Sequence, residues 1–203
     1  MKTERVFQKH VVDGSSFFFD RKHNTPDDQY ELRDDIAQAT NTSINDVIII
    51  GSAKLGFSVK TANFLEFDHL YTTTKNIRDK SDIDIALVNS RYFDEVAESI
   101  YHLSCHFDRN WIRQNWTTNQ YYLQDKVLFN EYSLYVAKGW LRPDFMPNSY
   151  LKAAAWQVPC DEWSKKLNRK VAVGIYSNWT YLKHYHMDHL STLQSKLLQL
   201  DIT

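Results

Sequence analysis

Hydrophobic residues along this chain form short runs of two kinds. Residues 47–50, 82–88 and 171–176 are short apolar stretches rich in Val and Ile, with acids at only two positions, and such stretches predict buried strands. Longer segments carry apolar residues every three or four positions and predict helices. The helices are expected at about 26–39, 91–107, 119–138, 149–157 and 177–199. Residues 15–19 are either a short strand or a tucked apolar segment.

The order of these elements indicates an α/β or α+β protein, because strands and helices alternate through the first half. A length of 203 residues fits one domain, or one domain with a helical appendage. We expect a core at 1–110 and a largely helical C-terminal region at 111–203, packed on the core as one compact unit. Residues 58–80 separate two core strands and are predicted to be an insert that folds against the rim of the site.

Two acids interrupt the strand predicted at 82–88. Side chains alternate between the two faces of a strand, so Asp82 and Asp84 project from the same face. Because like charges repel at this distance, the pair favours a divalent cation between them, Mg²⁺ or Mn²⁺. The strand predicted at 47–50 runs into Gly51 and Ser52, a turn where backbone N–H groups could approach a phosphate. Together the two motifs suggest nucleotide chemistry.

The ordered pair of motifs, Gly51-Ser52 and Asp82-Ile83-Asp84, resembles the signature of the nucleotidyltransferase superfamily, whose fold is shared with DNA polymerase beta. The resemblance covers roughly residues 44 to 105 and points to small bacterial members. It implies an α+β fold with a small mixed β-sheet core. The two motifs lie farther apart here than in typical members, which is why residues 58–80 are interpreted as an insert.

The resemblance also implies roles for individual residues. Gly51 and Ser52 would hold the triphosphate of an NTP, and Asp82 and Asp84 would be the catalytic metal ligands. Lys54 would contact the triphosphate or, alternatively, be an ordinary exposed lysine. Many members carry a third carboxylate on a later strand, and no such strand is evident after 88. The candidates for it are Asp144, in a turn-rich connector after Arg142, and the weaker Glu131. Arg142 could instead meet a phosphate.

The resulting hypothesis is a metal-dependent nucleotidyltransferase that moves a nucleoside monophosphate from an NTP to an acceptor. The acceptor would be a protein side chain, an RNA end or a small molecule, and the resemblance suggests a toxin–antitoxin or antiviral (phage-defence) system. The alternative is a catalytically degenerate member that binds a partner protein or a nucleotide. An RNA-binding accessory subunit is disfavoured by the net charge of −1.

Composition limits the setting of this chemistry. The chain is 43% hydrophobic and 14% aromatic, which is enough for a substantial core. No run approaches the roughly 20 apolar residues of a membrane span, and the first residues lack a signal-peptide pattern. We therefore expect a cytoplasmic protein without a membrane partner, in which Cys105 and Cys160 are reduced and mostly buried.

Overall fold

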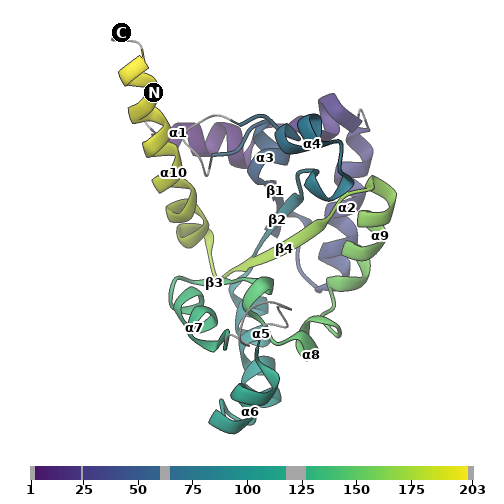
Figure 1. Ribbon diagram of the computed structural model, residues 1–203, viewed down its shortest axis with the longest axis vertical. Coiled ribbons are helices and arrows are strands. Elements are labelled where there is room, and N and C mark those ends of the chain that lie inside the picture. Colours follow the sequence, from purple (N-terminus) through teal and green to yellow (C-terminus); the bar gives the residue numbers. More distant parts are fainter. Residues whose placement is uncertain (1–2, 24, 60–64, 118–126, 201–203) are drawn as a thin grey trace.

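The computed structural model describes residues 3–23, 25–59, 65–117 and 127–200. A four-stranded sheet in the order β1-β2-β4-β3 lies between groups of helices (Figure 1). Its strands are β1 (Val47–Ile50), β2 (Ile83–Val88), β3 (Trp140–Leu141) and β4 (Val171–Tyr176). The central pair, β2 and β4, is parallel, while β1 and β3 run antiparallel to their neighbours. The sheet is therefore mixed, which confirms the α+β class, and each half of the chain supplies two strands.

The helices surround this sheet. In the first half they are α1 (Thr3–Val6), η1 (Phe7–Val12), η2 (Phe18–His23), α2 (Pro26–Ala39), η3 (Ile44–Asp46), α3 (Gly51–Leu55), α4 (His69–Thr74), η4 (Ile77–Asp79) and α5 (Ser90–Leu103). In the second half they are α6 (Arg109–Asn115), α7 (Phe129–Ala137), η5 (Pro143–Phe145), α8 (Asn148–Leu151), α9 (Gln157–Leu167) and α10 (Trp179–Leu200). None of the described helices has the length and apolar content needed to cross a membrane.

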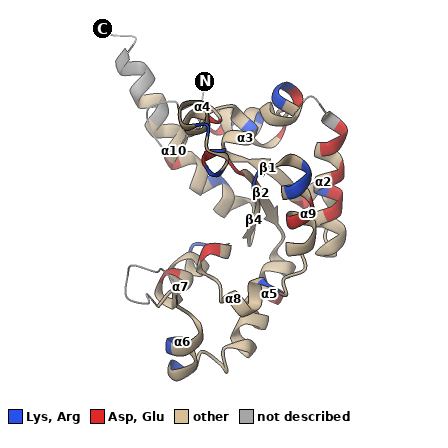
Figure 2. Ribbon diagram, turned by 45° about the vertical axis from the view of Figure 1, so that its right-hand side comes forward, with Lys and Arg blue, Asp and Glu red and all other residues tan. Residues whose placement is uncertain are grey.

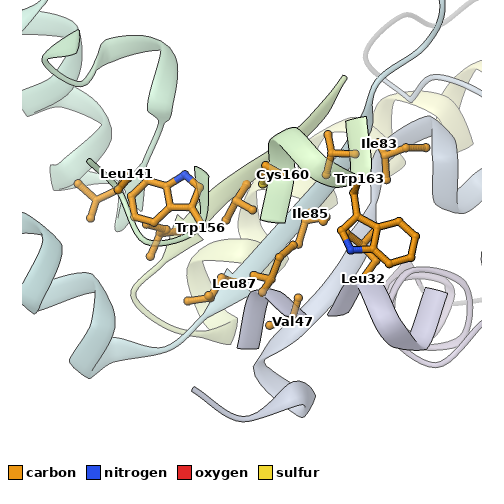
Figure 3. Close-up of a cluster of buried hydrophobic side chains, with 14 of the residues drawn as sticks. Leu32, Val47, Ile83, Ile85, Leu87, Leu141, Trp156, Cys160 and Trp163 are labelled. Carbon is orange, nitrogen blue, oxygen red and sulfur yellow. The ribbon is translucent and has the colours of Figure 1, made fainter. Parts of the chain in front are cut away.

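One face of the sheet carries the main hydrophobic core. The alternate residues of each strand that point to this face are β-branched or Leu, and α2, α5 and α9 cover them (Figure 3). The strand residues in this core are Val47, Ile49, Ile83, Ile85, Leu87, Leu141, Val171, Val173 and Ile175. Trp163 on α9 closes the core beside α2, and its indole N–H donates to Asp35 at 2.7 Å. Burial of these side chains accounts for the unbroken apolar runs in the sequence.

The helices α2 and α9 are also joined at their surface. Acidic positions follow one side of α2, and lysines lie at the end of α9 (Figure 2). Lys166 Nζ lies 2.9 Å from Asp28 Oδ1 and 3.5 Å from Glu31 Oε2. Because Lys166 is about half exposed, such pairs contribute about 1 kcal/mol or less each. The buried core, and not these pairs, holds the two helices together.

The second face of the sheet is less completely filled. Helix α10 and the N-terminal helices α1 and η1 pack against it, mainly over β1 and the far end of β2. The residues of β4 that share this face are Ala172, Gly174 and Tyr176, paired with Asp84, Ala86 and Val88 of β2. β3 pairs only with the last two residues of β4. The small side chains and the short β3 leave a hollow over the first half of β4.

Several predicted helices end elsewhere in the structure. The helix predicted at 91–107 begins at Ser90, where Asn89 Oδ1 accepts the N–H of Tyr92 at 2.9 Å, but it ends at Leu103. Residues 105–107 all have positive φ, from 51° to 63°, which no helix can contain. The apolar spacing in the sequence continues to Phe107 because this residue packs on the core from the turn after the helix.

The second half departs further from the prediction. Residues 149–157 were expected to be one helix, but α8 ends at Leu151 and α9, from 157 to 167, was not predicted. Of the helix predicted at 119–138, α7 accounts for 129–137, whereas residues 118–126 lie outside the described part. α8 has no buried residue, and α9 buries only Pro159, Cys160, Trp163 and Leu167, so neither helix shows a continuous apolar period. Residues 15–19 form no strand, and Phe18 and Phe19 are buried.

Candidate functional site

The Gly-Ser motif and the Asp pair lie together at one end of the β1–β2 strand pair, where β1 ends and β2 begins. Ile50 ends β1 and is the register partner of Asp84 on β2. Gly51 follows with φ +67° and begins the short helix α3. A Cβ atom on Gly51 would lie 2.8 Å from Asp84 Oδ2. This position therefore requires glycine for two reasons: its backbone conformation and the closeness of the Asp84 carboxylate.

Asp82 and Asp84 lie where the sequence predicts them, on one face of β2. Asp82 directly precedes the strand, and its carboxylate is 40% exposed and 3.6 Å from the ammonium of Lys170. Asp84 is partly buried, within the strand. Lys170 sits before β4 just as Asp82 sits before β2, because the two strands are parallel and begin side by side. The exposed pair contributes little stability, so Asp82 can exchange Lys170 for another cation at low cost.

These residues line a large cavity of about 950 Å³ that also reaches residues of the main core, such as Cys160 and Val173. One part of the lining holds the sequence-predicted residues Gly51, Ser52, Asp82 and Asp84. A wall of aromatic, basic and acidic side chains comes from α7, from β3 and the segment after it, from β4 and from α10. It includes Tyr135, Trp140, Arg142, Asp144, Tyr176, Tyr185, His186 and His189. The volume lies within the usual range for small-molecule sites.

Lys54 is not part of this cavity. Its side chain is only 5% exposed, and its Nζ donates a hydrogen bond to the carbonyl oxygen of Gly14 in the N-terminal segment. Burial lowers the pKa of Lys54, and the nearby Arg33 charge lowers it further. Both interpretations offered by the sequence, a triphosphate contact and an exposed lysine, are therefore wrong. α3 turns the residue three positions after Gly51 toward η1.

Asp144 lines the cavity but is not gathered with the Asp pair. It lies in η5, and Arg142 Nη2 donates to its carboxylate at 2.6 Å. In the part of the chain that the structure describes, no three His, Cys, Asp or Glu residues are close enough to hold a metal ion together. The strands β3 and β4 carry no acid. The third metal ligand proposed for Asp144 is therefore not in place in this structure.

A network behind Asp82 fixes the start of β2. Arg169 donates to both carboxylate oxygens of Asp68, at 3.0 and 3.2 Å, and to the carbonyl oxygen of Ser81 at 2.8 Å. Asp68 also accepts the Ser81 N–H at 2.9 Å, and both charged side chains are about 90% buried. The guanidinium packs between the rings of Phe18 and Phe67. Since Ser81 precedes Asp82 directly, this ion pair sets where the first carboxylate enters the cavity.

The predicted insert begins at the cavity. Ser58 and Val59 line the same cavity as Ser52, and the Phe67 N–H donates to the Gly56 carbonyl at 2.8 Å, which closes the excursion. The helix α4 lies within this insert, and Leu70 on it is 61% exposed. Residues 60–64 lie outside the described part.

Sequence reasoning missed the aromatic wall. The rings of Trp140 and Tyr176 stack with centroids 5.2 Å apart, and Tyr185 lies 4.7 Å from Trp140. Burial raises the pKa values of Tyr176 and Tyr185, so both phenols stay protonated and can donate hydrogen bonds. The only sequence signal was the position of Tyr176 on the same strand face as two small residues. That signal has meaning only once β4 is known to pair with β2.

A cysteine nucleophile is not part of this site. Cys160 on α9 lines the cavity, but it is buried, and burial raises the pKa of its thiol to about 12. A thiol that stays protonated is a poor nucleophile. Cys105 is exposed, contrary to expectation, and both cysteines are free. The other polar groups that line the cavity include carboxylates, hydroxyls, Arg142, Lys170 and two histidines.

The donor set suits Mg²⁺ or Mn²⁺ despite the missing third acid. Mg²⁺ prefers oxygen ligands and is usually bound by one or two carboxylates, with water and substrate phosphates completing the coordination. Asp82 and Asp84 supply two carboxylates from one strand face, and Asp82 is exposed enough to reach a hydrated ion. A nucleotide bound at Ser52 would bring the phosphate oxygens. These ligands therefore suit a metal ion that would bind together with a nucleotide.

Comparison with known proteins found no matching family model, no similar curated protein and no similar solved structure. The likeness to nucleotidyltransferases thus rests on the two motifs and on their meeting in this cavity.

Proposed function

We propose that this protein is a metal-dependent nucleotidyltransferase. The observation that carries the proposal is the closeness of Gly51 to the Asp84 carboxylate, since a Cβ atom on Gly51 would lie 2.8 Å from Asp84 Oδ2. Residues 33 positions apart meet at the mouth of one cavity, where a phosphate at Ser52 would lie beside the acids. Asp84 is the one acid within β2 and is partly buried, and a functional role would explain it because acids are depleted in strands and costly to bury.

In this mechanism Gly51 lets the phosphates approach the backbone, because it has no side chain between them and Asp84. Asp82 and Asp84 would hold Mg²⁺, and the bound ion would neutralise phosphate charge and favour ionisation of the acceptor hydroxyl. Release of Asp82 from Lys170 would accompany nucleotide entry and free that lysine to face the incoming phosphates. The acceptor hydroxyl would lose its proton to solvent as its oxygen bonds to the α-phosphorus, and the bond to pyrophosphate would break, with pyrophosphate taking the bond electrons.

The test is transfer of label from each of the four α-labelled NTPs, with Mg²⁺ or Mn²⁺ and a cell extract. We expect label to move into a defined macromolecule or small molecule with one base preferred, and Asp84→Asn to abolish it. Absence of metal-dependent label transfer under every condition would rule out the enzyme.

The second candidate, a degenerate nucleotidyltransferase fold that binds a nucleotide or partner, is favoured by one observation. β3 and β4 carry no carboxylate where many members of the family have a third acid on a later strand. In that case Mg²⁺-NTP would still raise the melting temperature without any label being transferred. The same labelled reaction, run beside a thermal melt, separates the two candidates.

A further inference from the structure

A buried ion pair lies directly behind Asp82. Arg169 donates to both carboxylate oxygens of Asp68, at 3.0 and 3.2 Å, and the two side chains are 8% and 10% exposed. Asp68 belongs to the insert, and Arg169 lies just before β4. Neither side chain is part of the cavity lining. The pair therefore does not touch a ligand there, and any effect on binding has to pass through a neighbouring residue.

That neighbour is Ser81, which precedes Asp82 and is held at three points. Its N–H donates to Asp68 Oδ1 at 2.9 Å, and its hydroxyl accepts the Asp68 N–H at 2.9 Å. Its carbonyl oxygen accepts a hydrogen bond from Arg169 at 2.8 Å. On the other side of Asp82, the N–H of Ile83 donates to the carbonyl oxygen of the residue before β4 at 2.8 Å. The backbone is thus fixed on both sides of the first carboxylate.

The same region places the cation that faces Asp82. Lys170 follows Arg169 directly, and its ammonium lies 3.6 Å from the Asp82 carboxylate. A further hydrogen bond joins Lys80 Nζ to the carbonyl oxygen of Asn168 at 3.2 Å. The segments that lead into β2 and β4 therefore keep one relative position, and with it the spacing between the carboxylate and the lysine.

This arrangement costs stability in three ways. Two charges are taken out of water, and a buried ion pair often contributes less than apolar side chains of the same volume. Asp68 has φ +64°, in the left-handed region that is uncommon for any residue with a side chain. The Nε of Arg169 is buried without a hydrogen-bond partner among the described residues. Since β2 and β4 are already held by their register and by the core, stability alone does not explain the pair.

We propose that Asp68 and Arg169 are positioning residues for the metal ligand Asp82, acting through Ser81 and contributing to metal affinity more than to stability. This rests on the proposed function, because it concerns the metal site of the same cavity. Hydrogen-bonded groups behind metal ligands typically contribute about ten- to a hundredfold to metal affinity. The insert that carries Asp68 is then a part of the metal site, although the proposed carboxylate ligands lie outside it.

The test is calorimetric titration of the folded full chain with Mn²⁺ and inorganic tripolyphosphate, which has the linked phosphates of an NTP without a base. The main variant is Asp68→Asn/Arg169→Met, which removes both charges, keeps the side-chain sizes similar and suits the left-handed position 68. We expect its melting temperature within about 5 °C of wild type, and its affinity for the probe at least about tenfold lower. Unchanged affinity in this folded variant overturns the proposal.

A second variant, Arg169→Lys, keeps the buried positive charge and tests the same idea if the double variant does not fold. One ammonium cannot replace the planar guanidinium fork, which binds Asp68 and the Ser81 carbonyl oxygen together. The affinity for the probe should therefore fall at least about threefold. Wild-type affinity in Arg169→Lys would equally overturn the proposal.

A positioning role predicts one result that a purely structural role does not. In an Asp82→Asn background the carboxylate to be positioned is already gone, so the double variant should cause no further loss of affinity. Leu32→Ala is the matched control, because Leu32 is fully buried in the main core and lies outside the cavity lining. It should lower the melting temperature without changing the affinity for the probe. An equal further loss in the Asp82→Asn background, or a loss as large in Leu32→Ala, contradicts positioning.

The proposed nucleotidyltransferase function fails by a different result. If wild type and Asp82→Asn respond alike to Mn²⁺ with tripolyphosphate, the metal site is wrong and the proposed function falls with it. If Asp82→Asn binds more weakly but the double variant binds like wild type, only the positioning role falls. If all binding results are as expected and no label from an NTP is transferred, the metal site and its positioning stand without the enzyme.

Discussion

Replacement of Gly51 by alanine should both destabilise the fold and disturb the Asp84 carboxylate. At φ +67° an alanine pays about 1–2 kcal/mol for the left-handed conformation. Its Cβ would also lie 2.8 Å from Asp84 Oδ2, and crowding of this kind typically costs about 1–3 kcal/mol. The two effects together predict a loss of about 2–5 kcal/mol. For a chain of this size that corresponds to a fall in melting temperature of about 4–20 °C.

The double mutant separates the two effects. In an Asp84→Ala background the carboxylate is gone, so Gly51→Ala should cost only the backbone strain. The coupling free energy between the two sites, measured by urea unfolding of the wild type, both single mutants and the double mutant, should therefore equal the crowding cost of about 1–3 kcal/mol.

Gly56 offers the matched control. It has φ +85°, and a Cβ there would lie 2.9 Å from Phe17 Cδ2, so Gly56→Ala should be comparably destabilising. Because the three atoms nearest that Cβ all belong to Phe17 and none to Asp84, this mutation should be additive with Asp84→Ala within about 0.5 kcal/mol. Additive behaviour of Gly51→Ala would show that the glycine and the carboxylate are not in contact, and the central observation behind the proposed function would be lost.

Three further mutations test the surroundings of the site. Asp84→Asn should keep the melting temperature without ligand within about 3 °C of wild type or raise it, since it removes one of two repelling acids. The rise in melting temperature with Mg²⁺-NTP should disappear in this mutant. Equal rises in both proteins would contradict the metal site. Burial raises the pKa of Asp68, but the hydrogen bonds and charge of Arg169 outweigh it and leave the pKa below its usual value. Asp68→Asn should therefore lower the free energy of unfolding by about 3–5 kcal/mol near pH 6. The difference from wild type should vanish as the pH falls through the lowered pKa, below about 3.9. A difference that stays constant with pH in urea unfolding would argue against the ion pair. Lys54→Met should leave the Mg²⁺-NTP shift unchanged in a thermal melt, because Nζ bonds Gly14 and not the cavity.

The strands and the acid pair could be predicted because their causes are local. Val47–Ile50 and Val171–Tyr176 are short, β-branched and apolar because both strands are buried by the core, and burial leaves its pattern in the sequence. Asp82 and Asp84 stand out for the same reason, as acids in a run that otherwise has none. Gly51 was found because it follows such a run directly.

The remaining parts depend on contacts between distant segments. Trp140, Arg142 and Tyr176 face Asp84 only because β4 pairs with β2 and β3 pairs with the end of β4. The buried lysine at 54 depends on the path of residues before 20, and the Arg169–Asp68 pair joins segments 101 positions apart. Contacts between distant segments leave no periodic pattern in the sequence. One sequence therefore shows which residue types are present but not which residues they contact.

The parallel pairing of β2 with β4 has a consequence for folding during synthesis. β2 obtains its first neighbour, β1, from residues made just before it, but Ile83 waits for Val171, 88 positions later. Until then the nascent chain presents an apolar strand with one unpaired edge, the kind of edge that invites wrong partners. Contacts this distant in sequence also slow folding. The protein should therefore depend on chaperones more during translation than its finished core suggests, and truncation before β4 should give chains that aggregate.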